Sequence, residues 1–143
     1  MKKRLFLLII LCMMLVVGCG KYEKNDWGED TFFNSVYAPN GKISKISKDY
    51  SENGKEFYTV LVNDYSYEKF YEYIMKLEDD GYHYEFLDEY VLDEVNKLPD
   101  NTETSWRAHK DNIYIIANWR SRDNANYSGY NLQLLFYNYD YTK

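Results

Sequence analysis

One segment, residues 66–81, carries the signals of an amphipathic helix, and it constrains the fold because its neighbours in sequence are typical of strands. Ser66 is a favourable N-cap residue, and Gly81 suits the left-handed conformation that often follows a helix. Four apolar residues recur at the spacing that places them on one helical face: Phe70, Tyr73, Ile74 and Leu77. The sequence therefore predicts a single strong helix over residues 67–80, whose apolar stripe must pack against other elements.

Strand patterns lie on both sides of this helix. Residues 56–62 (Glu-Phe-Tyr-Thr-Val-Leu-Val) are rich in β-branched and aromatic residues, and the preceding Asn53-Gly54 favours a hairpin. Further strands are predicted at residues 41–50, 82–86, 105–109, 113–119 and 130–139, with a second hairpin at 110–112. We therefore expect an α+β domain, with an antiparallel sheet of about five or six strands and one main amphipathic helix packed on one face.

The last two predicted strands carry apolar residues on both faces. Ile116 points away from Ile115, and Leu135 points away from Leu134 and from Leu132. We expect these strands to be central in the sheet, with their second face covered by the aromatic residues of the lead-in segment, residues 27–42.

A basic and then apolar segment opens the chain. Met1-Lys2-Lys3-Arg4 precedes about 13 apolar residues, the usual length for the apolar region of a signal peptide. Such a helix would be roughly 20 Å long, shorter than a hydrocarbon core of about 30 Å. Residues 16–19 (Val-Val-Gly-Cys) resemble the lipobox of bacterial lipoproteins, in which the cysteine thiol receives a diacylglyceryl group. We therefore expect lipidation at Cys19, and the alternative is an ordinary secretory signal.

These features divide the chain into three parts. Residues 1–18 form the signal peptide, residues 19–30 a polar tether, and residues 31–143 a single domain. Two acyl chains hold a protein stably on a membrane, so the expected location is the outer face of the bacterial cytoplasmic membrane. Cys12 is lost with the signal, so the mature domain has no thiol for a disulfide, for thiol chemistry or for a cysteine metal site.

The charge of the chain bears on its partners. The formal net charge is −6, from 17 basic and 23 acidic residues. Removal of Lys2, Lys3 and Arg4 leaves 14 basic and 23 acidic residues, and hence a net charge of −9. An acidic domain without a basic patch is not expected to bind nucleic acid.

Several motifs together resemble a domain of unknown function found in small lipoproteins of Gram-positive bacteria. They are Trp27 with Pro39-Asn40-Gly41-Lys42; a strand ending Val60-Leu-Val-Asn; the helix start Ser66-Tyr-Glu-Lys-Phe-Tyr-Glu-Tyr; Asp80-Gly81-Tyr82; and a Trp106 strand followed by a hairpin and a C-terminal strand. The resemblance covers residues 27–139 and implies a strand, a helix with a buried Tyr and a β-meander. The acidic segment 87–98, a short helix or an ordered loop, is longer than in that group. No activity is established for the group, so none is implied here.

Residues that could support catalysis or bind a metal are scattered. His83 and His109 lack the spacing of a zinc motif, and adjacent carboxylates such as Asp79-Asp80 point in different directions. Residues 123–126 (Asp-Asn-Ala-Asn) lack the length of a calcium-binding loop. We predict no cofactor, no metal and no enzymatic activity. The alternative is a carboxylate- or calcium-dependent envelope enzyme or accessory factor that uses Asp88 or Asp123. A transport substrate-binding protein would need two lobes and more chain.

The 17 tyrosines offer a different function. Tyr114 is expected to alternate outward from its apolar neighbours, and Tyr137 outward from Phe136. Exposed Tyr and Trp on a rigid sheet suit the binding of a protein or of a cell-wall glycan. We therefore predict a membrane-anchored binding module that uses Trp119, Tyr114 and Tyr137. The plainer alternative is that these rings are partly buried for stability and leave their hydroxyls in water.

Overall fold

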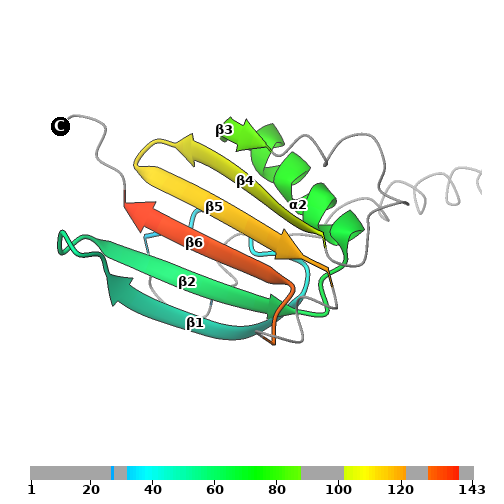
Figure 1. Ribbon diagram of the computed structural model, residues 1–143. Helices are drawn as coiled ribbons and strands as arrows, with labels where there is room; N and C mark the ends of the chain where they lie inside the picture. Colours follow the sequence, from blue (N-terminus) through cyan, green and yellow to red (C-terminus); the bar gives the residue numbers. More distant parts are fainter. Residues whose placement is uncertain (1–26, 28–31, 88–101, 122–128, 139–143) are drawn as a thin grey trace, which may run out of the picture.

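The computed structural model describes residues 27, 32–87, 102–121 and 129–138, which form six strands and one helix (Figure 1). The elements are β1 (Lys42–Tyr50), β2 (Glu56–Asn63), α2 (Tyr67–Asp79), β3 (His83–Leu87), β4 (Glu103–Lys110), β5 (Ile113–Arg120) and β6 (Leu132–Asn138). The strands form one sheet in the order β1-β2-β6-β5-β4-β3, and all neighbours are antiparallel. The predicted α+β class, the antiparallel sheet and the central place of the last two strands are confirmed.

Both ends of α2 follow from local chemistry. The Ser66 side chain accepts a hydrogen bond from the backbone N–H of Lys69 at 3.2 Å, which satisfies one of the free donors of the first turn. At the other end Gly81 has a φ of +93°, and the Tyr82 N–H donates to the Leu77 carbonyl oxygen at 3.1 Å. This is a Schellman ending, which requires a left-handed residue and so favours glycine. The predicted helix is confirmed, and it ends at Asp79.

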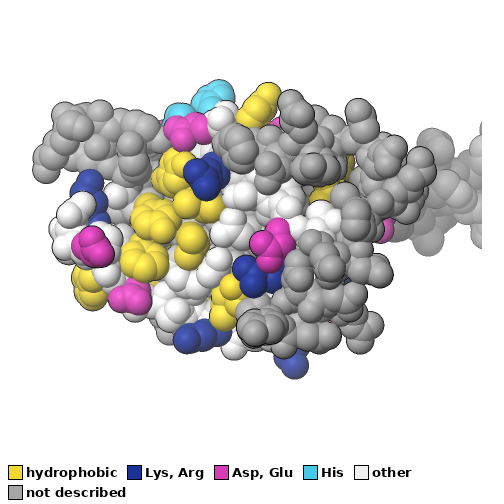
Figure 2. All heavy atoms as spheres, viewed as in Figure 1, with side chains coloured by type: hydrophobic (Ala, Val, Ile, Leu, Met, Phe, Trp, Pro, Cys, Tyr) yellow, Lys and Arg dark blue, Asp and Glu magenta, His cyan; other side chains and the backbone are white. Residues whose placement is uncertain are grey.

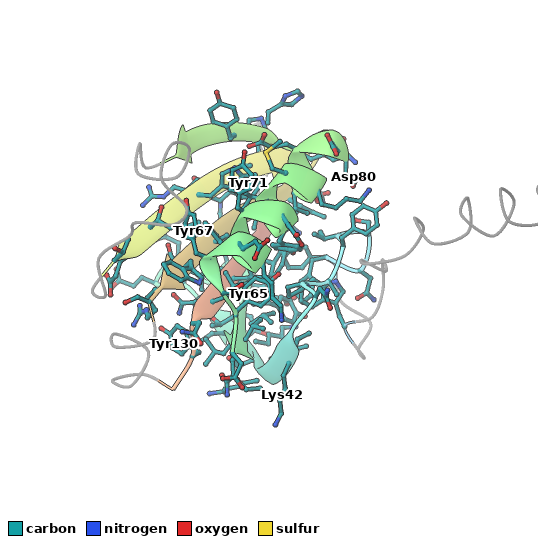
Figure 3. All side chains as sticks on the ribbon, turned by 90° about the vertical axis from the view of Figure 1, so that its right-hand side faces the viewer. Lys42, Tyr65, Tyr67, Tyr71, Asp80 and Tyr130 are labelled. Atoms are coloured by element: carbon teal, nitrogen blue, oxygen red, sulfur yellow. The ribbon has the colours of Figure 1, made fainter. Side chains whose placement is uncertain are left out.

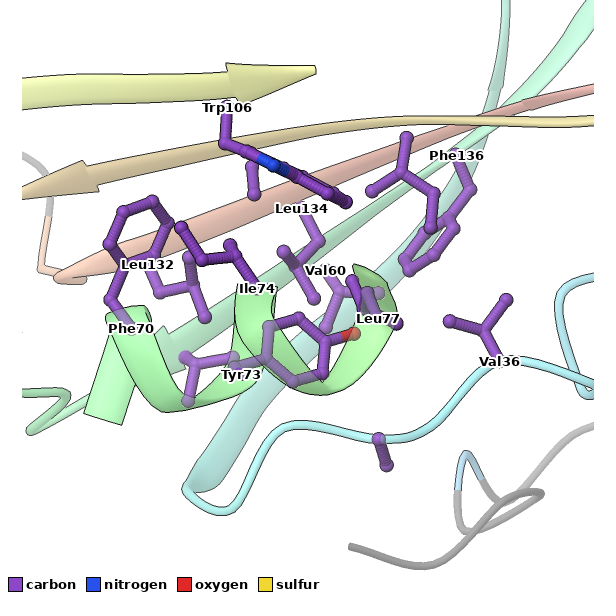
Figure 4. Packing of buried hydrophobic residues seen from close by; sticks show 14 of the residues in the cluster. Val36, Val60, Phe70, Tyr73, Ile74, Leu77, Trp106, Leu132, Leu134 and Phe136 are labelled. Carbon is purple, nitrogen blue, oxygen red and sulfur yellow. The ribbon is translucent and has the colours of Figure 1, made fainter. Parts of the chain in front are cut away.

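Buried residues alternate along β2, β4, β5 and β6, and together with α2 they form one cluster (Figure 4). The indole N–H of Trp106 donates to a carboxylate oxygen of Glu78 at 3.1 Å, so the polar atom of this fully buried ring has a partner. None of the helical structure in the described ranges has the length and apolarity that crossing a membrane requires.

The lead-in segment joins this same cluster. The Phe33 ring stacks on Phe136 with 4.2 Å between centroids, and Trp27 meets Phe136 edge-on at 5.3 Å. Phe136 shares its face of β6 with Leu132 and Leu134, whereas Leu135 lies on the other face. The expectation that these aromatic residues cover the second face of the sheet is therefore wrong. They pack instead on the face that carries Phe136, Leu132 and Leu134, which is the buried face of the sheet.

Gly41 lies between the lead-in and β1, where the backbone passes close to two buried side chains. A Cβ atom at this position would lie 2.6 Å from the Tyr65 ring and 2.7 Å from a methyl group of Val62. Both neighbours are buried, so neither can move aside easily. The chain turns at residues 39–41, where the Gly41 N–H donates to the Pro39 carbonyl oxygen at 2.9 Å, and this turn needs glycine because a side chain would not fit.

Candidate binding surface on the sheet

The strand residues that alternate with the buried cluster form a second face, which we call the outer face. Its members on the four strands β2, β6, β5 and β4 are Phe57, Thr59, Leu61, Asn63, Gln133, Leu135, Tyr137, Tyr114, Ile116, Asn118, Arg120, Glu103, Ser105, Arg107 and His109. All are partly or fully exposed. Figure 2 shows hydrophobic side chains gathered over the middle strands on the side drawn in front, with charged side chains around them.

Three aromatic rings form a row across the outer face. Phe57 on β2 is the register partner of Tyr137 on β6, and Tyr137 is the partner of Tyr114 on β5. The rings of Phe57 and Tyr137 are stacked, with centroids 5.3 Å apart and 19° between their planes, and Tyr114 meets Tyr137 at 6.3 Å. Cross-strand aromatic pairs stabilise a sheet and hold each ring in place. We call these three residues the aromatic row.

The structure thus brings together two of the three predicted binding residues, Tyr114 and Tyr137, and adds Phe57. Sequence reasoning missed Phe57, although the signal was present. Tyr58, which follows it, belongs with Val60 to the inward set of β2, so alternation alone places Phe57 outward. The next pair along the same strands, Leu135 and Ile116, extends the apolar surface.

Trp119 does not belong to this surface, and its predicted place there needs correction. Its side chain is only 7% exposed, and its ring meets the Tyr67 ring of α2 at 5.1 Å. The indole N–H donates to the Tyr65 carbonyl oxygen at 2.8 Å. Tyr67 is the first residue of α2 and Tyr65 lies two residues before it (Figure 3), and burial raises the pKa of Tyr67 to about 12. Trp119 is therefore a core residue that ties β5 to the helix.

A polar row lies beside the apolar part of the outer face. The Ser105 hydroxyl donates to the Asn118 side-chain oxygen at 2.8 Å, and the Asn118 amide donates to Gln133 at 3.2 Å. The three residues sit side by side on β4, β5 and β6, and we call them the amide row. On β5 and β6, neutral hydrogen-bonding groups thus lie further along the same strands as the aromatic rings.

A hollow of about 320 Å³ borders the amide row. Its lining residues are Glu103, Thr104, Ser105, Asn118, Trp119 and Arg120. Glu103 and Arg120 are register partners and form an ion pair at 4.0 Å, and the Arg120 guanidinium lies 4.8 Å from the centre of the Tyr130 ring. Cavities of this size suit small ligands or one unit of a larger ligand.

The two histidines meet at the sheet edge. His83 on β3 is the register partner of His109 on β4, with their rings 6.2 Å apart, and a nitrogen of His109 lies 3.2 Å from a Glu85 oxygen. In the described ranges, no group of three or more His, Cys, Asp or Glu is placed to hold a metal ion. Cys19, Asp88 and Asp123 lie outside the described residues, so the predictions that concern them stay predictions.

Comparison with known proteins returns no match. No protein-family model, no curated protein and no solved structure matches the chain. The resemblance to a domain of Gram-positive lipoproteins therefore rests on the sequence motifs alone.

Proposed function

We propose that this chain is a non-enzymatic binding module, held by lipid at Cys19 on the outer face of the bacterial cytoplasmic membrane. Its domain would present the outer face of the sheet to a partner in the cell envelope. The observation that carries the proposal is the aromatic row of Phe57, Tyr137 and Tyr114. Aromatic side chains on a rigid support bind with little loss of conformational entropy, because only two torsion angles become fixed.

In this proposal α2 packs on one face of the sheet, beside the lead-in, and the partner uses the other. The contacts of Trp119 with Tyr67, and of Trp106 with Glu78, support this assignment because they link two strands to the helix. The six-stranded sheet supplies the rigidity that a binding surface on its outer face requires.

The lipid anchor can be tested by metabolic labelling with an alkynyl fatty acid. We expect the full chain to become labelled in a bacterial host, and Cys19→Ser to reduce the label to background because the acceptor thiol is gone. Cys12→Ser is the matched control, since Cys12 lies within the proposed signal and should not affect labelling. Label that persists in Cys19→Ser would remove the anchor from the proposal.

The binding face can be tested with single cysteines, because the proposed mature domain contains no free thiol. We expect a membrane-impermeant maleimide to label Thr59→Cys, which lies on the outer face and keeps all three rings of the aromatic row, more slowly in intact cells than in the purified chain. A slowing of about fivefold or more corresponds to a partner present at several times its dissociation constant. Tyr84→Cys is the control, because Tyr84 is 61% exposed and lies on an edge strand outside the aromatic row.

Two results of this experiment would contradict the proposal. Equal rates for Thr59→Cys in cells and in the purified chain would mean that the outer face is unoccupied. A complete lack of labelling of Tyr84→Cys in intact cells would place the domain on the wrong side of the membrane.

A further inference from the structure

We infer that the outer face binds an uncharged glycan, a chain of pyranose sugars without carboxylate or sulfate groups. This inference rests on the proposed function and names the chemical class of its partner. Three features of the face carry it: the aromatic row, the amide row and the balance of charge among the residues around them.

The aromatic row suits the apolar faces of sugar rings. A pyranose ring presents a patch of C–H groups on each face, and such a patch packs against the face of an aromatic ring. Phe57, Tyr137 and Tyr114 lie on three neighbouring strands, so they form an apolar strip wider than one side chain. Phe57 and Tyr137 are stacked with 19° between their planes, so each covers part of one face of the other, and a sugar would pack on the ring surface that this stack leaves in solvent. Two of the three also carry a hydroxyl group, which can hydrogen-bond at the edge of a stacked sugar.

The amide row suits the hydroxyl groups of the next sugars. A carboxamide side chain offers two donor hydrogens and an acceptor oxygen with two lone pairs. Asn118 and Gln133 can therefore keep their mutual bond and still hydrogen-bond a ligand. Hydroxyl groups both donate and accept, so neutral amides and the Ser105 hydroxyl match them better than an array of like charges would.

The spacing of the two rows indicates an extended ligand. Tyr114 and Asn118 lie on the same face of β5 and are four residues apart, which is about 13 Å at roughly 3.3 Å per residue. One sugar cannot contact both residues. A short oligosaccharide along β5 would stack on the aromatic row and place a further sugar at the hollow beside the amide row.

Charge complementarity favours an uncharged ligand. The described residues of this side of the sheet include four basic and three acidic side chains: Lys42, Lys45, Arg107, Arg120, Asp49, Glu85 and Glu103. Their formal charges sum to +1, whereas the whole chain carries −6. Glu103 already pairs with Arg120, so part of this charge is neutralised within the face. A strongly charged partner would find little net attraction here.

The same features disfavour a second copy of this chain on the face. Two sheets packed face to face would remove water from the Glu103–Arg120 pair and from the amide row, which is costly unless new partners replace the water. A hydrated ligand rich in hydroxyl groups leaves these side chains hydrogen-bonded.

The inference can be tested by calorimetric titration of the full chain in detergent with cellohexaose and with chitohexaose, two uncharged oligosaccharides. We expect at least one of them to bind, and Tyr114→Ala and Tyr137→Ala each to weaken its binding about tenfold. Tyr84→Ala is the matched control and should bind like the unmodified chain, because its ring lies outside both rows. A melting temperature of each variant well above the temperature of the titration shows that the loss is not caused by unfolding.

The outcomes separate this inference from the proposed function. If neither oligosaccharide binds while Thr59→Cys is protected in cells, the glycan is excluded and a different partner occupies the face. If Tyr84→Ala weakens binding as much as Tyr114→Ala does, the glycan does not use the aromatic row and the inference fails. If sedimentation shows a dimer that Tyr137→Ala dissociates, the occupant is a second copy of this chain.

Discussion

Trp119→Ala is expected to lower the free energy of unfolding by about 3–5 kcal/mol, because it empties a large buried site between β5 and α2. The Trp119 ring packs against Tyr67 and Phe70 and is 7% exposed, so nearly all of its surface loses contacts on truncation. The change also leaves the buried Tyr65 carbonyl oxygen without the indole donor that now lies 2.8 Å away.

Urea unfolding followed by circular dichroism measures this effect. Trp119→Phe is the matched control, because it keeps an aromatic ring in the site and removes the indole N–H. We expect it to cost about 1–3 kcal/mol, mainly because the Tyr65 carbonyl oxygen loses the indole donor. Tyr114→Ala, on the outer face, should cost less than Trp119→Ala. If Trp119→Ala has no effect on stability but abolishes ligand binding, Trp119 belongs to the binding surface after all.

The error over Trp119 concerns strand alternation, and the sequence contained the information to avoid it. Tyr114 is predicted outward because Ile113 and Ile115 point inward. Trp119 follows Ile115 by an even number of residues, so it shares the inward face in any unbroken strand. The aromatic type of Trp119 makes it a candidate for a binding surface, but its position in β5 places it in the core.

Other features of the surface could not be predicted from the sequence. Alternation says which face a residue occupies, but it does not say which strands become neighbours. The stacking of Phe57 on Tyr137 depends on the pairing of β2 with β6, which lie far apart in the sequence. The meeting of His83 with His109 depends in the same way on the pairing of β3 with β4.

The local predictions succeeded for a related reason. The helix at residues 67–79 is specified by its own apolar spacing, by the Ser66 cap and by Gly81, which act within a few residues of one another. The apolar residues of the lead-in have no regular spacing. The position of the lead-in on the domain therefore depends on which hydrophobic surface the other elements leave uncovered. That surface is the side of the sheet that carries Phe136.

Phe33→Ala tests the place of the lead-in, and we expect it to lower the free energy of unfolding by about 3–5 kcal/mol. The Phe33 ring is fully buried and contacts three other rings, with centroid distances of 4.2 Å to Phe136, 4.9 Å to Trp27 and 5.1 Å to Tyr58. Its removal would open a cavity at the junction of the lead-in, β2 and β6, and water would gain access to that end of the core.

Phe32→Ala is the matched control for this test. The Phe32 ring is only partly buried and contacts Phe33 and Tyr58 at centroid distances of 5.8 and 5.3 Å. Because part of its surface is already in water, truncation should cost clearly less than at Phe33. Urea unfolding of both variants gives the comparison. Equal and small costs at the two positions would mean that Phe33 is not part of the core. The lead-in would then be free to cover the outer face, where it would compete with any ligand of the aromatic row.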